Sequence, residues 1–288
     1  MRILVTGAKG RLGSRLLALL RAEHAALGVD LDEADITQRA DMERVFAQAQ
    51  PQLVFHCAAL TAVDYCAEHP DEALRVNALG TQNVALACQQ HGSALLYVST
   101  NEVFAGERFR EHLEYDQPAP VNPYGYSKWA GEQIVRELVP RHYVVRTAWL
   151  FAHGGRNFVQ VILGRAREGK PLRVVTNEVG NPTYNDDLAA ALIQLATTEQ
   201  YGTYHLTNTG YTSRYEFARL ILDLAGYAHV PIEPITLAQY PRASRPPRYA
   251  VLRNFAAAQL GITLRPWPQA LAAFLRAENW LVEHPDDE

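Results

Sequence analysis

Thr6-Gly7-Ala8-Lys9-Gly10-Arg11-Leu12-Gly13 is the stretch that decides the fold of this chain. The apolar run Arg2–Thr6 precedes it and a helical pattern over Arg11–Glu23 follows it, which places three glycines at a turn from a strand into a helix. Glycine permits a tight turn there and lets the backbone approach a pyrophosphate, whose charge then lies at the helix N-terminus. The spacing GxxGxxG differs by one residue from GxGxxG, but the strand and helix around it indicate a dinucleotide-binding turn.

Outward from this turn, short apolar runs alternate with helical patterns over the first 150 residues. This alternation is typical of parallel strands joined by crossover helices, and it predicts an α/β fold with a doubly wound, Rossmann-like parallel sheet. The expected strands are Arg2–Thr6, Ala26–Asp30, Leu53–Cys57, Leu95–Ser99 and Tyr143–Arg146. The expected helices are Arg11–Glu23, about Ala40–Ala49, about Asp71–Gln90 and about Tyr124–Leu138.

After Trp149 the pattern loosens and prolines punctuate the C-terminal third. Strands are expected at Leu172–Thr176 and Thr203–Leu206, and helices near Arg214–Leu224 and Pro268–Glu278. We therefore expect a dinucleotide-binding domain over residues 1–150 and a smaller, mainly substrate-binding region over 151–288. Segments near 172–207 are expected to return to the main sheet.

Composition excludes several classes of protein. Apolar residues make up 48% and charged residues 20% of the 288 positions, as in folded globular proteins. A formal net charge of −4 argues against a nucleic-acid binder. No apolar run approaches the roughly 18 residues of a membrane span, and the N-terminal run is too short for a signal peptide. Three cysteines without CxxC spacing indicate a reducing compartment, so we expect a cytoplasmic protein without a membrane partner.

Asp30 ends the second expected strand, 17 residues after Gly13. A carboxylate there can accept hydrogen bonds from the ribose hydroxyls of an adenosine and would repel a 2′-phosphate. We therefore expect NADH to be at least competitive with NADPH as cofactor. Asp35 and Ile36 are expected to border the adenine.

A Thr–Tyr–Lys set follows the fourth expected strand. Ser99 and Thr100 end that strand, and Tyr124 and Lys128 lie one helical turn apart on one face of the next helix. An ammonium beside a phenol should lower the phenol's pKa and make it a proton donor near neutrality. Random placement of 14 tyrosines and three lysines gives only about 0.15 such YxxxK pairs, which favours a catalytic interpretation.

These residues resemble the extended short-chain dehydrogenase/reductase superfamily and, over nearly the whole chain, the dTDP-4-dehydrorhamnose reductase family. The segments that carry the closer resemblance are Ala58-Ala59-Leu60-Thr61-Ala62-Val63-Asp64, Thr147-Ala148-Trp149-Leu150-Phe151, Gly155-Arg156-Asn157-Phe158, Gly180-Asn181-Pro182-Thr183 and Arg245-Pro246.

The resemblance implies reduction of the C4 ketone of a nucleotide sugar, dTDP-4-dehydro-6-deoxy-L-mannose, to dTDP-L-rhamnose, with NADH or NADPH. It implies Tyr124 as proton donor, assisted by Lys128 and Thr100. The residues expected to bind the cofactor are Gly7, Lys9, Gly10, Arg11, Leu12, Gly13, Asp30, Asp35, Ile36, Ala58, Ala59, Thr61, Ser99, Tyr124 and Lys128. The residues expected to bind the substrate are Val63, Thr100, Asn101, Trp149, Asn157 and Arg248.

The chain departs from the family pattern in two further places besides Asp30. Asn101-Glu102 stand where the family usually has Asp-Tyr. Arg15 stands where members that bridge dimers through Mg²⁺ carry a glutamate, so we expect a monomer or a homodimer without such a bridge. No metal site is expected elsewhere, because the ten histidines form no cluster at ligand spacing.

Three alternatives stay open from the sequence. Ser99-Thr100-Asn101-Glu102-Val103 also resembles the S-T-D-E-V of nucleotide-sugar 4,6-dehydratases, although an asparagine cannot donate the proton that their aspartate supplies. A 4-epimerase would hold NAD⁺ tightly, whereas a reductase releases its cofactor at each turnover. The third alternative is a non-catalytic relative, such as a regulatory subunit of methionine adenosyltransferase, which the complete Thr–Tyr–Lys set disfavours.

Overall fold

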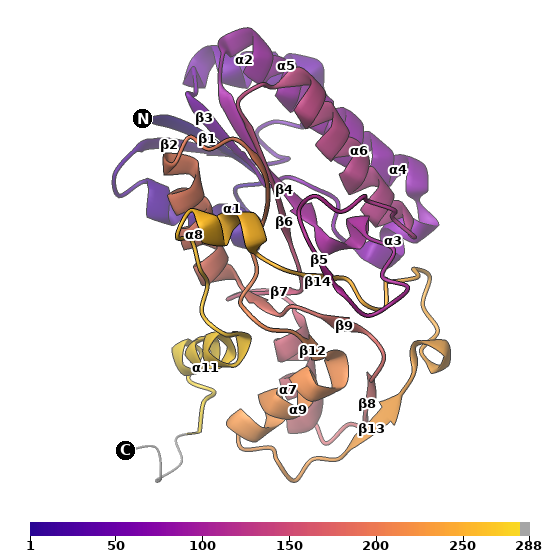
Figure 1. Cartoon of the computed structure of the whole chain (residues 1–288). Coiled ribbons are helices and arrows are strands. Elements are labelled where there is room, and N and C mark those ends of the chain that lie inside the picture. Colours follow the sequence, from indigo (N-terminus) through magenta and orange to yellow (C-terminus); the bar gives the residue numbers. More distant parts are fainter. Residues whose placement is uncertain (283–288) are drawn as a thin grey trace.

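The computed structural model describes residues 1–282 and is built on a six-stranded parallel sheet (Figure 1). Its strand order is β11-β6-β4-β3-β1-β2, so the chain crosses over at β1 and continues to both sides. The strands are β1 (Arg2–Thr6), β2 (Ala25–Val29), β3 (Leu53–His56), β4 (Ala94–Thr100), β6 (His142–Thr147) and β11 (Gly202–His205). The predicted doubly wound α/β fold is confirmed.

Helices cover both faces of this sheet. One face carries α2 (Arg39–Ala49), α5 (Thr81–His91) and α6 (Pro123–Leu138), and the other carries α1 (Arg11–Leu20) and α8 (Asn185–Thr197) (Figure 1). Side chains along β1 alternate between the two faces of the sheet: Ile3 and Val5 pack toward α1 and α8, whereas Leu4 packs toward α2 and α5. Burial on both faces explains why the strands read as continuous apolar runs.

The helix expected over Asp71–Gln90 is instead three consecutive pieces. They are α4 (Pro70–Leu74), the π-helical segment η1 (Arg75–Gly80) and α5, preceded by the short α3 (Val63–Glu68). A π-helical segment shifts the register of the backbone hydrogen bonds, which apolar periodicity does not report. Here it turns Asn77 toward the loop after β3, where Asn77 bonds both the N–H and the C=O of Leu60, at 2.8 and 3.0 Å.

The rest of the chain forms a second core below the sheet. It comprises α7 (Phe158–Arg167), α9 (Arg214–Leu224) and α11 (Trp267–Ala277) with a parallel pair, β8 (Leu172–Val175) and β13 (Ile232–Ile235). Within the stretch 172–207, α8 and β11 return to the main sheet, but β8 does not, because it pairs with β13.

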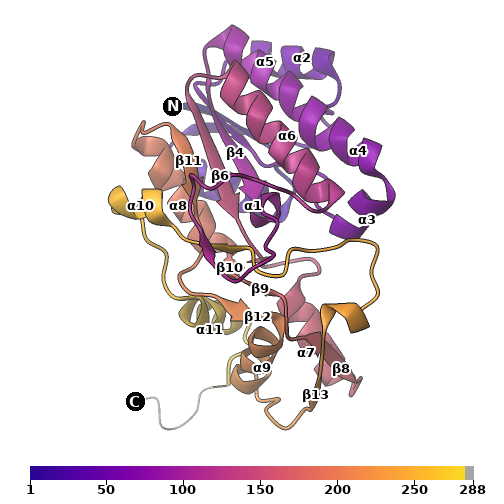
Figure 2. The same ribbon diagram turned by 45° about the vertical axis from the view of Figure 1, so that its right-hand side comes forward.

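Short strand pairs lie between the main sheet and the second core (Figures 1 and 2). They are β7 (Leu150–Phe151) with β10 (Thr183–Tyr184), β9 (Val179–Gly180) with β12 (Thr212–Ser213), and β5 (Glu111–His112) with β14 (Val251–Leu252). Helix α10 (Phe255–Gln259) and the 3₁₀ turns η2 (Asn101–Val103) and η3 (Leu237–Gln239) complete the structure.

Hydrogen bonds between segments distant in sequence hold the start of α1 and the end of β4. Asn185 donates to the Arg11 carbonyl at 3.1 Å, and the Arg11 guanidinium donates to the Arg156 carbonyl at 3.1 Å. Asn101 donates to the Ala250 carbonyl at 3.1 Å. The Asn185 bond joins α8 to α1 on one face of the sheet, and the other two bonds join the start of α1 and the end of β4 to segments of the C-terminal half of the chain.

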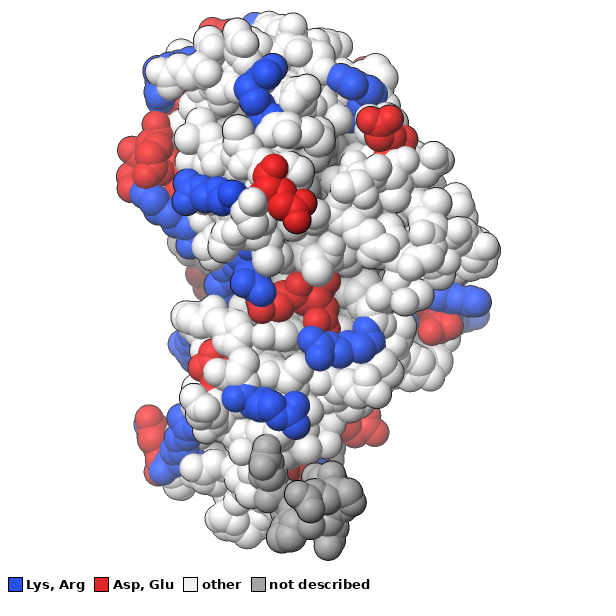
Figure 3. Space-filling model, turned by 90° about the vertical axis from the view of Figure 1, so that its left-hand side faces the viewer, with Lys and Arg blue, Asp and Glu red and all other residues white. Residues whose placement is uncertain are grey.

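Charged side chains are mixed on the face that Figure 3 shows, where blue and red groups lie beside one another. Salt bridges such as Arg265–Asp187 pair opposite charges across elements. Over residues 1–282, no helix combines the length and the apolar character that a bilayer crossing requires.

Candidate active site

Two adjoining pockets open at the carboxyl ends of the strands, the edge at which doubly wound sheets bind ligands. The β2 pocket contains Asp30, Asp35, Ile36 and Ala58, and the β4 pocket contains Thr100, Tyr124, Lys128 and Trp149. Gly7, Lys9, Gly10, Cys57 and Ala59 line both, so the glycine-rich turn lies at the boundary between them.

The glycine turn is packed too closely for side chains. Gly7 has a φ of +70°, and a Cβ there would lie 2.6 Å from the backbone nitrogen of Ala58. A Cβ on Gly13 would lie 2.1 Å from the Gly7 carbonyl oxygen. Gly10 is the N-cap of α1, and the first turn of that helix carries no acidic residue, so its N–H groups face the pocket without a competing carboxylate. These features fit a dinucleotide pyrophosphate.

Asp30 is held at the end of β2. Its carboxylate accepts the N–H groups of Lys9 and Leu31, each at 2.8 Å, and lines the β2 pocket. The Lys9 ammonium pairs with Asp32 and Glu33. The arrangement fits an adenosine ribose on Asp30.

Arg75 also lines the β2 pocket, and the sequence analysis missed it. It lies in the π-helical segment, where its guanidinium donates to the Thr37 hydroxyl at 3.3 Å. A cation 45 residues beyond Asp30 gives no local signal in the sequence. The Arg75 guanidinium can attract a 2′-phosphate that Asp30 would repel, so the pocket disfavours NADPH less than Asp30 alone indicates.

The end of β4 and the first turn of α6 bring the three expected catalytic residues to one pocket. Helix α6 begins at Pro123, and its N-cap Asn122 accepts the Gly125 N–H at 2.8 Å, which orients the turn that carries Tyr124. Lys128 is buried one turn further, with its Nζ 4.1 Å from the ring centroid of Tyr97.

The electrostatics of Tyr124 and Lys128 differ from the expectation. Burial raises the pKa of Tyr124 and the Glu102 charge raises it further, while a hydrogen bond with Thr100 acts in the opposite direction. Burial lowers the pKa of Lys128 to about 7, against the charges of Cys57 and Glu132. The prediction that Lys128 lowers the pKa of the phenol is therefore wrong, because burial and the Glu102 charge dominate at Tyr124 and Lys128 is not among the groups that shift its pKa.

Ser99 lines the β4 pocket, but its hydroxyl serves a buried ion pair. It donates to Glu132 Oε1 at 2.6 Å, and the same carboxylate binds the fully buried Arg146 at 2.7 and 2.9 Å. Thr100 is thus the hydroxyl of this strand end that acts on Tyr124, whose pKa it lowers.

The expected substrate residues divide into two groups. Val63, Asn101 and Trp149 line the β4 pocket, whereas Asn157 and Arg248 line neither pocket. Asn157 is instead the N-cap of α7: it accepts the Gln160 N–H at 3.2 Å and donates to the Ala152 carbonyl at 2.7 Å, so its amide is already bonded. The side chain of Arg248 is exposed, and the backbone carbonyl of Arg248 accepts the N–H of Val179 at 2.7 Å.

All the other residues expected to bind the cofactor line one or both pockets. Asp35, Ile36 and Ala58 lie in the β2 pocket, and Arg11, Leu12, Gly13, Thr61 and Ser99 lie in the β4 pocket.

Two charged residues of the β4 pocket were missed by the sequence analysis. Glu102 follows Thr100 in the turn η2, and Arg214 begins α9. The Arg214 guanidinium carbon lies 3.5 Å from the Trp149 ring centroid, and its Nε donates to Glu178 at 3.0 Å. Glu102 was visible as a departure from the family pattern, but no spacing rule links Arg214 to this pocket.

The Arg15 side chain is a cation that is already paired within the chain. It forms a salt bridge with Asp186 of α8 at 3.0 Å. Among the described residues, no group of three or more His, Cys, Asp or Glu side chains is arranged to hold a metal ion.

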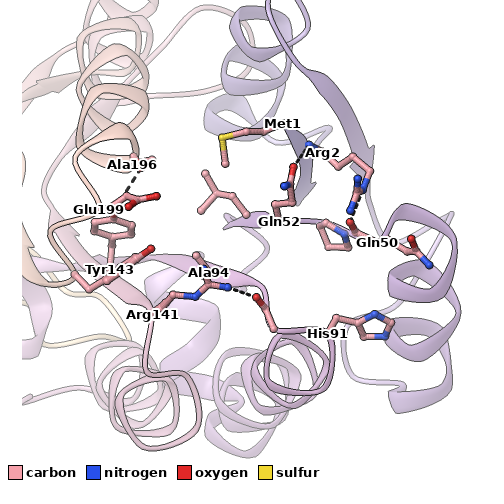
Figure 4. Close-up of a pocket in the computed structure, with 14 residues that line it drawn as sticks. Met1, Arg2, Gln50, Gln52, His91, Ala94, Arg141, Tyr143, Ala196 and Glu199 are labelled. Carbon is pink, nitrogen blue, oxygen red and sulfur yellow. Dashed lines mark hydrogen bonds between the residues drawn. The ribbon is translucent and has the colours of Figure 1, made fainter.

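A separate hollow lies at the amino ends of the strands, where β1, β3, β4 and β6 begin (Figure 4). Arg2 donates to the Gln50 carbonyl at 2.7 Å, and Arg141 donates to the Gly92 carbonyl. Both cations are thus engaged by backbone, and none of the expected site residues lies there.

The chain is similar to known proteins over nearly its full length. The family described as RmlD substrate binding domain matches residues 1–279. A dTDP-4-dehydrorhamnose reductase of Mycobacterium tuberculosis is 38% identical over 284 residues, covering 96% of this chain and 93% of the relative.

Two solved structures are similar over nearly the full length. A dTDP-4-dehydrorhamnose reductase of Clostridium acetobutylicum has a TM-score of 0.93 at 36% identity, covering 97% of this chain and 100% of that chain. One of Bacillus anthracis, in complex with NADP, has a TM-score of 0.92 at 37% identity, covering 96% and 99%. The chain belongs to the dTDP-4-dehydrorhamnose reductase family of nicotinamide-dependent oxidoreductases, within the extended short-chain dehydrogenase/reductase superfamily.

Proposed function

We propose that this protein reduces the C4 ketone of dTDP-4-dehydro-6-deoxy-L-mannose to give dTDP-L-rhamnose, with Tyr124 as the proton donor. The observation that carries the proposal is the convergence of Thr100, Tyr124 and Lys128 on the pocket that the glycine turn also lines. The reductases of this family at 36–38% identity support the substrate class.

The cofactor would be held by the glycine turn, Asp30 and Lys128. When bound, the nicotinamide supplies the hydride that reduces the carbonyl carbon. We infer that NADH is at least competitive with NADPH, because the Asp30 carboxylate is fixed in the β2 pocket, where it would bind a ribose and repel a 2′-phosphate. Arg75 in the same pocket supports use of NADPH as well.

Proton transfer falls to Tyr124. Its raised pKa keeps the phenol protonated throughout the neutral range, so it enters the reaction as a donor to the carbonyl oxygen. Thr100 lines the same pocket as Tyr124, and its hydroxyl can donate to the same oxygen and orient it. Lys128 is the cation one turn away that can stabilise the phenolate left after transfer.

The rest of the β4 pocket would hold the sugar. Val63 and Trp149 supply apolar surface, and Asn101 is anchored to the Ala250 carbonyl. The Asn101 amide also disfavours a 4,6-dehydratase, since an amide has no acidic proton for the leaving hydroxyl. We propose a monomer or a homodimer without a metal bridge, because Arg15 is paired with Asp186.

The decisive experiment is incubation with dTDP-4-dehydro-6-deoxy-L-mannose and either NADH or NADPH, followed by identification of the product. Oxidation of the cofactor together with formation of dTDP-L-rhamnose is expected. Tightly held NAD⁺ with exchange of C4 configuration would identify an epimerase instead. Binding of dinucleotide without turnover of any sugar nucleotide would identify a regulatory protein.

A further inference from the structure

Glu102 is the one acidic side chain of the β4 pocket within residues 1–282, and the proposed reaction gives it no role so far. Three contacts fix it. Its N–H donates to Thr100 Oγ1 at 3.2 Å, and its Oε2 accepts from Asn122 Nδ2 at 2.6 Å. A Cβ at Gly125 would lie 2.1 Å from the Glu102 carbonyl oxygen, so its backbone packs directly on the first turn of α6.

The groups that fix Glu102 are those that position the carbonyl-binding residues. Thr100 ends β4, and Asn122 caps the helix turn that carries Tyr124. Glu102 is therefore held in a fixed position relative to the hydroxyl groups of Thr100 and Tyr124. Within residues 1–282, Oε1 of Glu102 makes no hydrogen bond. Because Glu102 lines the pocket, this oxygen can accept a hydrogen bond from a ligand.

Charged groups of both signs surround the Glu102 carboxyl group. Burial raises the pKa of Glu102 to about 7, the Asn122 hydrogen bond lowers it, Glu178 raises it, and Arg242 and Arg214 lower it. Either form of the carboxyl group, charged or neutral, can bond a hydroxyl.

A 4-dehydro-6-deoxy sugar has unequal neighbours on its two sides of the ketone. The carbon on one side, C3, carries a hydroxyl, and the carbon on the other side, C5, carries a methyl group. With the ketone oxygen bound by Tyr124 and Thr100, rotation about the carbonyl axis exchanges these neighbours and also exchanges the face of the ketone that receives the hydride. A carboxyl group beside the ketone distinguishes the two orientations, because it bonds a hydroxyl and is poorly solvated by a methyl group.

We propose that Glu102 binds the sugar hydroxyl adjacent to the ketone and thereby fixes which face of the ketone is reduced, which makes it the residue that determines the C4 configuration of the product. The inference rests on the proposed reductase function. It assigns Glu102 to substrate orientation, with Asn122 as the residue that positions it.

The test compares wild type with Glu102→Gln, Glu102→Leu and a control on the same helix as Tyr124, the exposed Glu137→Gln. Each enzyme is given dTDP-4-dehydro-6-deoxy-L-mannose and its 3-deoxy analogue. We measure KM, kcat and, by NMR, the ratio of C4 epimers in the product. Calorimetry with dTDP-L-rhamnose gives binding without turnover.

For Glu102→Leu we expect KM for the hydroxylated substrate to rise about 10- to 100-fold, with a rise of at least about tenfold in the minor C4 epimer. Glu102→Gln should show a smaller change in the same direction, because an amide still bonds a hydroxyl. Both variants should match wild type on the 3-deoxy analogue, and Glu137→Gln should match it on both. Since a glutamine retains an oxygen for Asn122, that variant should unfold at the wild-type temperature.

Equal losses on both substrates with an unchanged epimer ratio would overturn the inference and leave the proposed function standing. Solvent deuterium at C3 or C5 of the wild-type product, absent with Glu102→Gln, would also overturn it, since the carboxylate would then act as a base. A wild-type protein that neither binds nor reduces either nucleotide sugar would overturn the proposed function and this inference together.

Discussion

Burial and the charge of Glu102 raise the pKa of Tyr124, so its phenol stays protonated at neutral pH. Replacement by phenylalanine removes the proton and leaves the ring that fills the site. We expect Tyr124→Phe to lower kcat by about two to four orders of magnitude while the affinity for NADH is kept. Steady-state kinetics and fluorescence titration of NADH check this. Turnover near the wild-type value would remove Tyr124 from the role of acid.

Asp30 gives a second test at the level of one side chain. Its carboxylate is placed to bind ribose hydroxyls and to repel a 2′-phosphate. Asp30→Ala should narrow any preference for NADH over NADPH, measured as the ratio of the two dissociation constants. Asp32→Ala is the control, because Asp32 is exposed and pairs with Lys9. An unchanged ratio for Asp30→Ala would show that the ribose lies elsewhere.

Lys128 predicts a pH dependence of stability. Its pKa in the folded protein is about 7, below the ordinary value of 10.5. Between these pH values the unfolded chain binds more protons than the folded chain, so the free energy of unfolding rises with pH over this window. The cost of burying the ammonium is thus greatest below about pH 7.

Lys128→Met should therefore raise the thermal midpoint most at about pH 6, with a gain that shrinks toward about pH 9.5. The exposed Lys170→Met should show a difference that does not vary in this way. Thermal unfolding across this pH range measures both. A gain for Lys128→Met that stays constant with pH would contradict the lowered pKa.

For single residues, the proposed catalytic set of Thr100, Tyr124 and Lys128 could be predicted from the sequence, because local spacing ties these residues together and the structure brings them to one pocket. The sequence analysis did not find Arg75 and Arg214, which reach the pockets through tertiary contacts, and it misplaced Asn157, whose amide caps a helix. The sign of the Tyr124 pKa shift was also wrong, since burial cannot be read from a YxxxK spacing.

Among the elements, the turn into α1 has the least tolerance for change. A methyl group on Gly13 would collide with the Gly7 carbonyl, so Gly13→Ala has to move the helix away from the turn. We expect a loss of about 1–3 kcal/mol in the free energy of unfolding and at least about a tenfold loss in NADH affinity.

Gly164→Ala is the matched control for this substitution. Gly164 lies within α7, and a Cβ there meets nothing within 4 Å. Alanine should leave NADH affinity unchanged and add up to about 1 kcal/mol of stability. Denaturant unfolding and NADH titration compare the two variants. Equal behaviour would refute the packing argument for Gly13.

Element boundaries were predictable where one periodicity applied throughout. Helix Arg214–Leu224 has the predicted limits, and the five strands of the first 150 residues lie within one residue of theirs at each end. The stretch from Pro70 to His91 was not resolved into its pieces, because a π-helical segment keeps an apolar face while it changes the hydrogen-bond pattern.

At the scale of the whole molecule, the absence of a metal from the proposed mechanism can be tested. Arg15 occupies the position of a bridging glutamate and is paired with Asp186. Incubation with EDTA should leave both the oligomeric state and the reductase activity unchanged, as measured by light scattering and by NADH oxidation. A large loss of activity, restored by Mg²⁺, would contradict this.

The overall architecture was predictable, but the strand partners of its C-terminal part were not. The pattern of alternating strands and helices decides a doubly wound sheet, whereas the pairing of β8 with β13 joins segments about 60 residues apart that no local signal connects.

The sheet and the pocket are both completed by late segments of the chain. β11 covers the edge of β6, Arg214 lines the pocket and Ala250 anchors Asn101. During synthesis on the ribosome, Tyr124, the proposed proton donor, is made long before these segments emerge. A nascent chain that ends short of them exposes the strand edge of β6 and lacks part of the proposed sugar site. Activity should thus appear only late in translation, and chaperones that shield open strand edges have their main opportunity before β11 arrives.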